Sequence, residues 1–389
     1  MLNITYDLSV LKDEDYIKNN KLINKPWGKN NKIYNIITYD KNIITYDMVD
    51  QMKIFRSIIC GNSNSNSNIH AFSPPKSFNI MAFMDKYNEE NSQLTDCIAE
   101  EYIEGTMINL FYDNTINKWE IATKSSVGGN ITFFKDQPTF AKLFYEICDE
   151  MKIKFDLFSK DCCYSFVMQH PENKFVLQIS EKRLYLIACY KIENYTVTLL
   201  PRENVTLPEN ILLPIQYNML SYNELFMLYG SMNTDASIPG VMIYHKNGDR
   251  TKIHNPNYKY IKYLRGNNTK LQFQYLSLRR DNLINENLKY FPENIKQFQI
   301  FKQQLYNFSN TLYANYIQCY IKKEQPLIQF PKEFRVHMYN LHQYYLSIRE
   351  NRGYINKTVI IQYINSLEPA KLMYSLNYNM RNFAKTLQT

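Results

Sequence analysis

The sequence lacks long apolar runs and has few glycines. No stretch approaches the ~18 consecutive apolar residues that a membrane-spanning helix requires, so we expect no membrane association. Met1–Val10 contain no basic region followed by an apolar run, which argues against a secretory signal. Only 10 glycines occur in 389 residues, which excludes collagen-like repeats and Gly-rich linkers.

Cysteine and histidine are also sparse, and their spacing does not match common disulfide, redox or zinc-binding motifs. The seven cysteines are odd in number and include no C-x-x-C, so we expect free thiols in a reducing compartment. The six histidines form no H-E-x-x-H and no Cys/His pattern that suits zinc. His170, in a turn before Pro171, is interpreted as a structural hydrogen-bond partner. No P-loop, G-x-G-x-x-G or G-x-S-x-G is present.

The composition is that of a globular protein with a basic C-terminal part. Hydrophobic residues make up 45%, charged residues 21% and aromatic residues 15%. The net charge of +8 suggests an anionic partner, and residues 281–389 hold 13 Lys and Arg against 7 Asp and Glu. This basic region is either a solvated helical surface or a footprint for the phosphate backbone of a nucleic acid.

From about residue 50 to 265 the pattern predicts short strands. The turn Asn247-Gly248 is the strongest hairpin signal, and Asn62–Asn68 (NSNSNSN) is interpreted as a hairpin loop. A helix is expected near Gln137–Lys152. The predicted strands are rich in β-branched and aromatic residues: Lys53–Cys60, Ile69–Phe72, Met107–Tyr112, Trp119–Thr123, Tyr164–Gln169, Phe175–Ile179, Arg183–Tyr190, Thr196–Leu200, Val241–His245 and Arg250–His254.

After about residue 281 the apolar spacing becomes helical. Ile295, Phe298, Phe301 and Leu305 recur at intervals of three and four after Pro292, as expected for one face of a helix. The pattern therefore predicts the α+β class, with a domain of antiparallel sheets and flanking helices over residues 1–275 and an all-α domain over 281–389.

A series of segments, in order, resembles one family. The segment 55–59 (FRSII) is similar to an x-R-G-I-x-F strand, 72–76 (FSPPK) to S-x-P-x-x-K-F, and 102–106 (YIEGT) to K-x-D-G-S. Further along, 119–128 (WEIATKSSVG) resembles F-K-S-K-G-S. Segment 165–176 (SFVMQHPENKFV) resembles F-E-F-V-x-P-x-N-R-I-V, and Pro239-Gly240 with Lys252-Ile253-His254 resembles an E-G…K-I-K hairpin.

The family is the ATP-dependent RNA ligases of the phage RNA-ligase-1 type, members of the covalent nucleotidyltransferase superfamily, and the resemblance covers about residues 30 to 265. It implies a nucleotidyltransferase fold, with ATP and Mg²⁺ as cofactors and RNA 5′-phosphate and 3′-hydroxyl ends as partners. In this family a Lys amine attacks the α-phosphate of ATP and carries AMP, which passes to an RNA 5′-phosphate and is displaced by a 3′-hydroxyl. Cations close to the phosphates and carboxylates that hold Mg²⁺ are therefore required.

Most of the matched basic positions are retained in this sequence. The resemblance assigns nucleotide binding to them and metal binding to the acid that replaces Asp in the third segment. The nucleotide-binding candidates are Arg56, Lys76, Tyr102, Glu104, Gly105, Lys124, Lys252 and His254. Glu104 is the candidate metal ligand, and His254 stands where the family has a second Lys.

Three positions depart from the family pattern. Tyr102 stands where the nucleophilic Lys is expected, and Val167 and Pro239 each replace a Glu. A phenol cannot form a phosphoramidate, so a relocated nucleophile would have to be Lys76 as first choice, or Lys124 or Lys252. Glu100 and Glu101 are alternatives for a lost carboxylate, although we expect both to lie in solvent at a strand start.

Three functions remain open on these residues. The first is an enzyme that joins RNA ends with ATP and Mg²⁺, and the second is a catalytically inactive homologue that binds RNA or acts as a scaffold. The third makes the Tyr-rich helical domain a docking surface for a protein partner. The Asn-, Ile-, Lys- and Tyr-rich usage suggests an AT-rich genome, so we expect a viral, cytoplasmic protein, including the virus factory or the virion.

Overall fold

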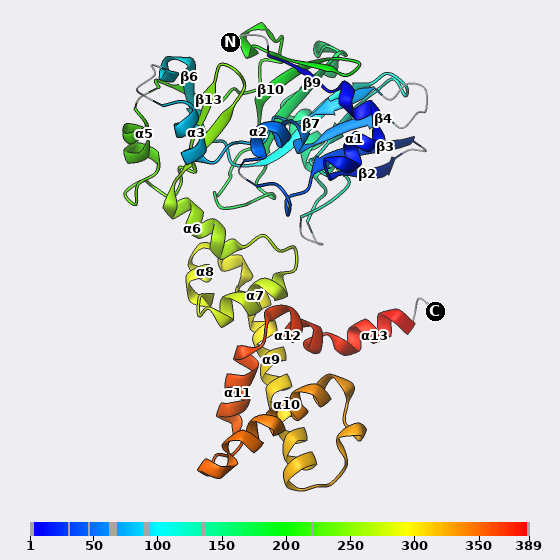
Figure 1. Ribbon diagram of the computed structural model, residues 1–389, viewed down its shortest axis with the longest axis vertical. Coiled ribbons are helices and arrows are strands. Elements are labelled where there is room, and N and C mark those ends of the chain that lie inside the picture. Colours follow the sequence, from blue (N-terminus) through cyan, green and yellow to red (C-terminus); the bar gives the residue numbers. More distant parts are fainter. Residues whose placement is uncertain are drawn as a thin grey trace. The chain divides into compact units, whose positions relative to one another are not determined.

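Three antiparallel sheets occupy the N-terminal part of the chain in the computed structural model of this protein (Figure 1). The structure describes residues 4–29, 32–45, 47–61, 68–88, 93–133, 137–219 and 221–386. It divides into two compact units, Met1–Tyr260 and Ile261–Thr389. Sheets with helices in the first unit and helices alone in the second confirm the predicted α+β class with its helical C-terminal region.

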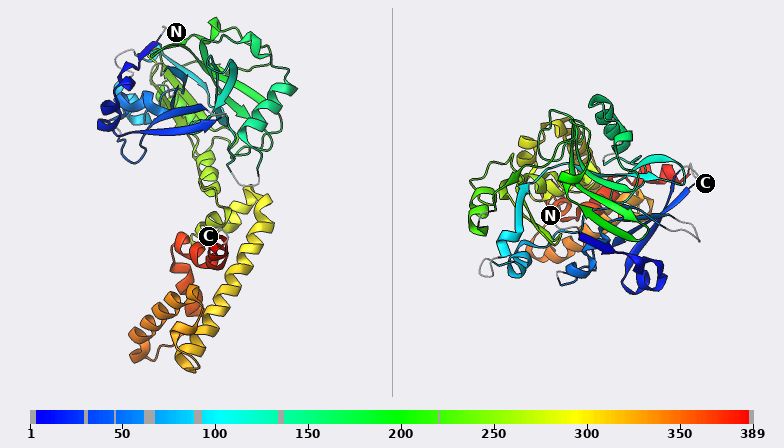
Figure 2. Two further views of the ribbon diagram at one scale, coloured as in Figure 1. Left: turned by 90° about the vertical axis from the view of Figure 1, so that its right-hand side faces the viewer. Right: turned by 90° about the horizontal axis from the view of Figure 1, so that it is seen from above.

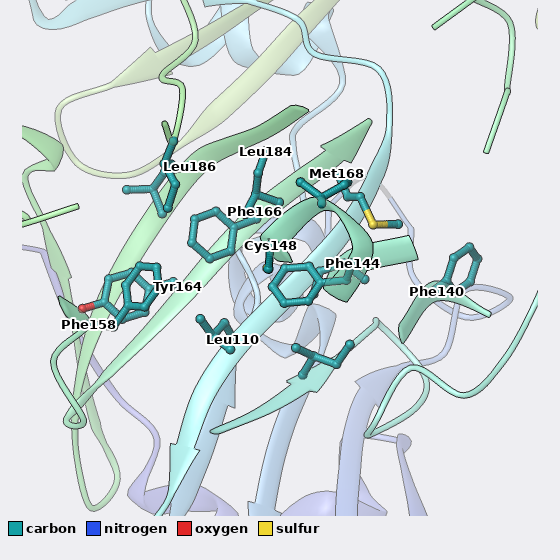
Figure 3. Close-up of a cluster of buried hydrophobic side chains, with 14 of the residues drawn as sticks. Leu110, Phe140, Phe144, Cys148, Phe158, Tyr164, Phe166, Met168, Leu184 and Leu186 are labelled. Atoms are coloured by element: carbon teal, nitrogen blue, oxygen red, sulfur yellow. The ribbon is translucent and has the colours of Figure 1, made fainter. Parts of the chain in front are cut away.

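The largest sheet has six strands in the order β1-β11-β10-β9-β7-β8, and every neighbouring pair is antiparallel. Helix α4 (Phe140–Glu150) places Phe144, Ile147 and Cys148 against this sheet, where they meet buried residues such as Leu110 and Phe166 (Figure 3). The strands are β1 (Ile4–Asp7), β7 (Thr106–Asp113), β8 (Lys118–Ala122), β9 (Cys162–Gln169), β10 (Arg183–Glu193) and β11 (Thr196–Leu200).

Two four-stranded sheets complete the first unit, in the orders β12-β6-β13-β14 and β2-β3-β4-β5. Their strands are β2 (Leu22–Lys29), β3 (Lys32–Tyr39), β4 (Ile58–Gly61), β5 (Ile69–Phe72), β6 (Cys97–Glu101), β12 (Gln216–Tyr217), β13 (Gly240–His245) and β14 (Arg250–His254). The other helices of this unit are α1 (Glu14–Asn19), α2 (Val49–Met52), the 3₁₀ helix η2 (Lys53–Arg56), α3 (Ile80–Lys86) and α5 (Tyr222–Tyr229).

The second unit has its own core, and its longest helix is α9 (Ile295–Tyr316), drawn in yellow in Figure 2. The division between the units falls within α6 (Pro256–Arg265). The remaining helices are α7 (Leu271–Arg280), α8 (Ile284–Tyr290), α10 (Lys332–Ile348), α11 (Lys357–Ser366), α12 (Pro369–Leu376) and α13 (Tyr378–Thr386). Among the described residues, no helix has both the length and the apolar character needed to cross a bilayer.

The helical unit begins earlier in the chain than the predicted boundary between 275 and 281. Tyr275, Leu276 and Leu278 of α7 belong to the buried cluster of this unit, together with Leu264 of α6. The side-chain amides of Gln274 and Asn287 both donate to the carbonyl of Leu264, at 2.5 and 2.9 Å. These contacts place α7 with the helices that follow it.

Most of the predicted strands are confirmed, and two predictions are wrong. The segment Lys53–Arg56 is the 3₁₀ helix η2, and only Ile58–Gly61 of that stretch forms a strand. Residues 175–179 form no strand, and β9 pairs instead with β7 and β10. The predicted hairpin loop at 62–68 lies largely outside the described residues, although β4 and β5 on either side of it do pair.

Candidate functional site

Tyr102 lies directly after β6, and two residues of β14 face its ring. The Nζ of Lys252 is 5.3 Å from the centre of the Tyr102 ring, and the His254 ring is 5.5 Å from it. The strand register brings them together, because β13 pairs with β6 on one side and with β14 on the other. Burial, with a smaller contribution from the charge of Glu104, raises the pKa of Tyr102, so the phenol stays protonated and is a poor nucleophile.

Arg56 ends the helix η2 and is partly buried. Its Nη1 donates to the carbonyl of Pro74 at 3.2 Å and lies 3.7 Å from the sulfur of Met107. Burial, reinforced by the charge of Arg250, lowers the pKa of Arg56 to about 10. Within the described part of the chain no carboxylate lies within ion-pair distance of this guanidinium.

Two more cations, Lys76 and Lys124, lie in the segments that follow β5 and β8. Burial and the charge of Arg56 lower the pKa of Lys76. Burial lowers the pKa of Lys124 to about 8, and the charges of Lys41, Arg56 and Lys76 add to this effect. The Nζ of Lys124 lies 4.9 Å from the centre of the Tyr39 ring.

Arg56, Lys76 and Lys124 differ from several lysines of the first unit that have an acidic partner. Lys29 pairs with Glu120, Lys32 with Asp113, and Lys53 with Asp249. Among the described residues, neither Lys76 nor Lys124 has an acidic partner, and the same holds for Arg56. An unpaired charge that is partly removed from water loses hydration energy, which favours an anion as the missing partner.

Glu104 and Gly105 hold the turn that follows Tyr102. The Oε1 of Glu104 accepts hydrogen bonds from the backbone N–H groups of Val176 and Leu177, at 3.0 and 2.9 Å. These bonds draw the segment 175–177 away from a strand pairing. The Oε2 of Glu104 is buried and has no hydrogen-bond partner among the described residues, so one oxygen of this carboxylate remains available to a ligand.

Gly105 is required by close packing against β9. A Cβ atom at this position would lie 2.5 Å from the carbonyl oxygen of Met168 and 2.7 Å from Cγ1 of Val167. The retention of glycine in this segment is therefore explained by the approach of two backbones, since any larger residue would force them apart.

Two of the three departures from the family pattern, Val167 and Pro239, leave apolar groups where carboxylates were expected. Val167 is buried in a small apolar cluster with Ile103 and Tyr185. Pro239 supplies only its carbonyl, which accepts from the backbone N–H of Asn255 at 3.1 Å. Of the three positions where the family pattern has a carboxylate, Glu104 is thus the one that still provides it.

Glu100 does not lie in solvent, contrary to the prediction. It is 1% exposed, and its carboxylate pairs with Arg202 and accepts from the side-chain amide of Gln216 at 3.3 Å. Burial raises the pKa of Glu100, and the charge of Arg202 opposes that shift. Glu101 is half-buried, and its carboxylate accepts from the backbone N–H of Ile215 at 3.3 Å.

Sequence reasoning missed Arg250, which supports the segment that carries Lys76. Its Nε donates to the carbonyl of Pro75 at 2.8 Å and its Nη2 to that of Pro74 at 3.1 Å. Arg56 donates to the carbonyl of Pro74 as well, so both guanidinium groups hold the same turn. The sequence signal for Arg250 was the alternation of side chains between the two faces of β14, which places Arg250 and Lys252 on the same face.

His170 belongs to a separate cluster with Glu146 and Glu172, the group of potential metal ligands found in the described chain. Its Nδ1 accepts from the backbone N–H of Glu172 at 3.1 Å, and its Nε2 lies 3.2 Å from a carboxylate oxygen of Glu146. The neutral ring therefore carries its proton on Nε2, facing Glu146, and this arrangement suits a hydrogen-bonded turn better than a metal ligand.

Comparison with known proteins gives distant likenesses. No family model matches the chain. It is 24% identical over 313 residues to the immediate-early protein ICP-46 homolog of Invertebrate iridescent virus 3, covering 77% of this chain and 67% of that protein.

Among solved structures, the chain is similar to an archaeal ATP-dependent RNA ligase, with 9% identity, a TM-score of 0.40 and 72% of each chain covered. It is also similar to a putative ATP-dependent DNA ligase from Aquifex aeolicus, with 13% identity, a TM-score of 0.39, and coverage of 85% of this chain and 86% of that one. For a Naegleria gruberi RNA ligase variant with ATP and Mn, identity is 9%, the TM-score 0.37, and coverage 67% and 83%. These identities and TM-scores are too low to carry an argument about function, which is therefore based on the side chains described above.

Proposed function

We propose that this chain is an RNA-ligase-like protein of the nucleotidyltransferase type that binds ATP and the phosphorylated ends of RNA at the cluster of Arg56, Lys76, Lys124 and Lys252. The supporting observation is that the first three are partly buried and have no acidic partner among the described residues. Phosphate oxygens would supply the missing negative charge, and the planar guanidinium of Arg56 suits two of them at once.

The residues present fit the phosphates of ATP better than they fit a metal ion. Glu104, with its unpartnered Oε2, is the residue that would hold Mg²⁺. When bound, the ion would neutralise charge on the phosphates. Val167 and Pro239 offer no side-chain oxygen, so metal binding relies on fewer carboxylates than in the family that the sequence resembles.

Equilibrium binding of ATP tests this proposal directly. We expect Arg56→Gln and Lys124→Met each to weaken ATP binding about ten- to a hundredfold, the range for hydrogen bonds to charged groups. Lys118→Met is the matched control, because Lys118 is exposed on the same strand that leads to Lys124. Failure of the wild-type protein to bind ATP at millimolar concentration, or equal binding by all variants, would overturn the proposal.

ATP-dependent joining of RNA ends is the more demanding candidate, and the lowered pKa of Lys124 favours it. A pKa of about 8 leaves about a tenth of this amine neutral at pH 7, against well under a thousandth at an ordinary value. The neutral amine would attack the α-phosphorus of ATP, form a P–N bond and release pyrophosphate. An RNA 5′-phosphate would then accept the AMP, and a 3′-hydroxyl would displace it.

The test is charging with α-labelled ATP in the presence of Mg²⁺ or Mn²⁺, followed by mapping of any acid-labile adduct. An adduct on Lys124 that Lys124→Met abolishes would support catalysis by Lys124. An adduct on Lys76 would instead identify Lys76, the first candidate from the sequence, as the nucleophile. Absence of any adduct in a protein that binds ATP would favour the alternative, an inactive homologue that binds RNA or acts as a scaffold. The loss of the expected Lys and two Glu residues supports that alternative.

We propose that the protein is viral and that it is located in the cytoplasm, with the virus factory and the virion as its specific candidate locations. The relative from an iridescent virus supports the viral part of this proposal. We also propose that the helical unit binds a protein partner. Affinity capture from infected cells would test both the location and the partner.

A further inference from the structure

The helical unit contains a groove that the proposed function does not use. It lies between α7, α8, α9 and the start of α11, four helices labelled in Figure 1, and has a volume of about 600 Å³. This volume falls within the ~300–1,000 Å³ range of ligand sites in proteins. All of its lining residues belong to the second unit.

The charged residues in the groove are all positive. Arg279, Lys302 and Lys357 line it, and its lining includes no Asp or Glu. Within the described residues none of these three cations has an acidic partner. Some other basic residues of the unit are paired, namely Lys289 with Glu286 at 2.6 Å and Lys322 with Glu324 at 3.5 Å.

Four carboxamides also line the groove: Asn282, Asn285, Gln299 and Asn310. Their side chains have no hydrogen-bond partner among the described residues. Each carboxamide offers both a donor and an acceptor, which is the pattern that the edges of nucleic-acid bases present.

Aromatic rings complete the lining. Tyr306 is 62% exposed although it lines the groove, and Tyr313 lies two turns further along α9. Exposed rings beside cations are the usual platform on which the bases of single strands stack. A groove for an apolar peptide helix would not need unpaired carboxamides and cations together.

We propose that this groove binds a single-stranded segment of RNA, with Arg279, Lys302 and Lys357 on the phosphates, the carboxamides on base edges and Tyr306 stacked on a base. The proposal rests on the proposed function for its class of substrate, RNA. It adds a second contact, independent of the terminal phosphate, through which the helical unit would select an unpaired strand.

The test uses the full chain and a fluorescent oligouridine of twelve nucleotides that carries no 5′-phosphate. We expect the double variant Lys302→Ala/Lys357→Ala to weaken binding at least tenfold. The slope of log affinity against log salt should also fall by about 1.4, for two phosphate contacts on a single strand. Tyr306→Ala should weaken binding about tenfold with little change in the salt slope.

The matched control is Lys289→Ala/Lys322→Ala, which removes the same charge from the same unit at paired positions and should leave binding within about twofold, as for exposed ion pairs. Circular dichroism would verify that each variant is folded. Oligouridine binding that the groove variants do not change would overturn the proposal. So would binding of a polyglutamate peptide, but not of oligouridine, through the same lysines, since the groove would then serve an acidic protein partner.

The two proposals fail in different ways. Arg56→Gln should lose ATP affinity while it keeps oligouridine affinity, and the groove variants should show the reverse. Loss of ATP binding alone would therefore leave the groove proposal standing as an RNA site, whereas loss of oligouridine binding alone would leave the nucleotide site standing.

Discussion

Lys124 is the residue whose ionisation depends most clearly on its neighbours. Burial lowers its pKa to about 8, and Arg56 is among the cations that add to the shift. Arg56→Gln should therefore raise the pKa of Lys124 and move its amine reactivity to more alkaline pH. Mass spectrometry after brief labelling with an amine-reactive reagent, across pH 6 to 11, would measure this change. Superimposable profiles in the two proteins would show that Arg56 does not act on Lys124.

Replacing Gly105 by a larger residue is predicted to lower the stability of the protein. A methyl group there would be forced into the carbonyl of Met168 and the side chain of Val167. Gly105→Ala should therefore lower the free energy of unfolding by about 1–3 kcal/mol, as overpacking typically does. Urea denaturation would measure it. Gly28→Ala is the control, because no atom lies within 4 Å of the added carbon, and a similar loss in both variants would contradict the packing argument.

The basic residues of the candidate site could be predicted from the sequence because each lies in a short segment with a recognisable pattern. The contacts made by the carboxylates Glu104 and Glu100 could not be predicted. Glu104 binds the backbone at Val176 and Leu177, more than 70 residues away, and Glu100 pairs with Arg202, 102 residues away. Such contacts depend on the folded arrangement of the sheets, and no local spacing reports them.

At the scale of elements, the β13–β14 hairpin is tied to α3 and η2 through one buried carboxylate. Asp249 accepts from Lys53 at 2.5 Å, from Lys86 at 2.9 Å and from the Tyr87 hydroxyl at 2.5 Å. Burial alone would raise the pKa of Asp249, but these donors outweigh it, and the pKa is lowered. The stability that the carboxylate contributes is therefore present above its unfolded pKa of about 3.9 and is lost as the pH falls through the lower folded value.

Asp249→Asn should lower the free energy of unfolding by about 3–5 kcal/mol at pH 7, as expected when a buried ion pair loses one partner. It should also flatten the decline in stability below about pH 4. Denaturant titrations at several pH values would measure both effects. Asp50→Asn is the control: Asp50 pairs with the same two lysines but is 54% exposed, so we expect a loss of at most about 1 kcal/mol. Equal losses in the two variants would refute the role given to burial.

The elements that the sequence predicted well are those with local signals. The hairpin at Asn247-Gly248 follows from turn chemistry, and Gly248 has a φ of +89°, which glycine adopts without strain. The prediction failed at Lys53–Arg56, where a β-like composition forms a 3₁₀ helix. Phe55 is buried there in a cluster with Tyr39 and Ile58, and Lys53 reaches Asp249, so tertiary contacts decide the local structure.

At the scale of the whole molecule, the chain contains cores that share no residue between the two units. The core of the second unit draws on residues from Leu264 to Met373, whereas the clusters of the first unit end at Ile253. Tyr258, in α6, is buried as well and lies just before the division between the units. The helical periodicity after residue 281 revealed the second unit but not its start, because α7 carries buried polar residues such as Gln274 within its apolar face.

This organisation predicts different behaviour for two fragments. A fragment of residues 261–389 should be helical and melt cooperatively, because it retains Leu264 and the three buried apolar residues of α7. A fragment of residues 281–389 lacks Tyr275, Leu276 and Leu278. The loss of these core side chains, at about 2–5 kcal/mol each, is comparable to the whole ~5–15 kcal/mol stability of a typical domain. We therefore expect it to show reduced helicity and no cooperative transition in circular dichroism. A cooperative melt of the shorter fragment would place the boundary after α7, because the helices from α8 onward would then form a core without it.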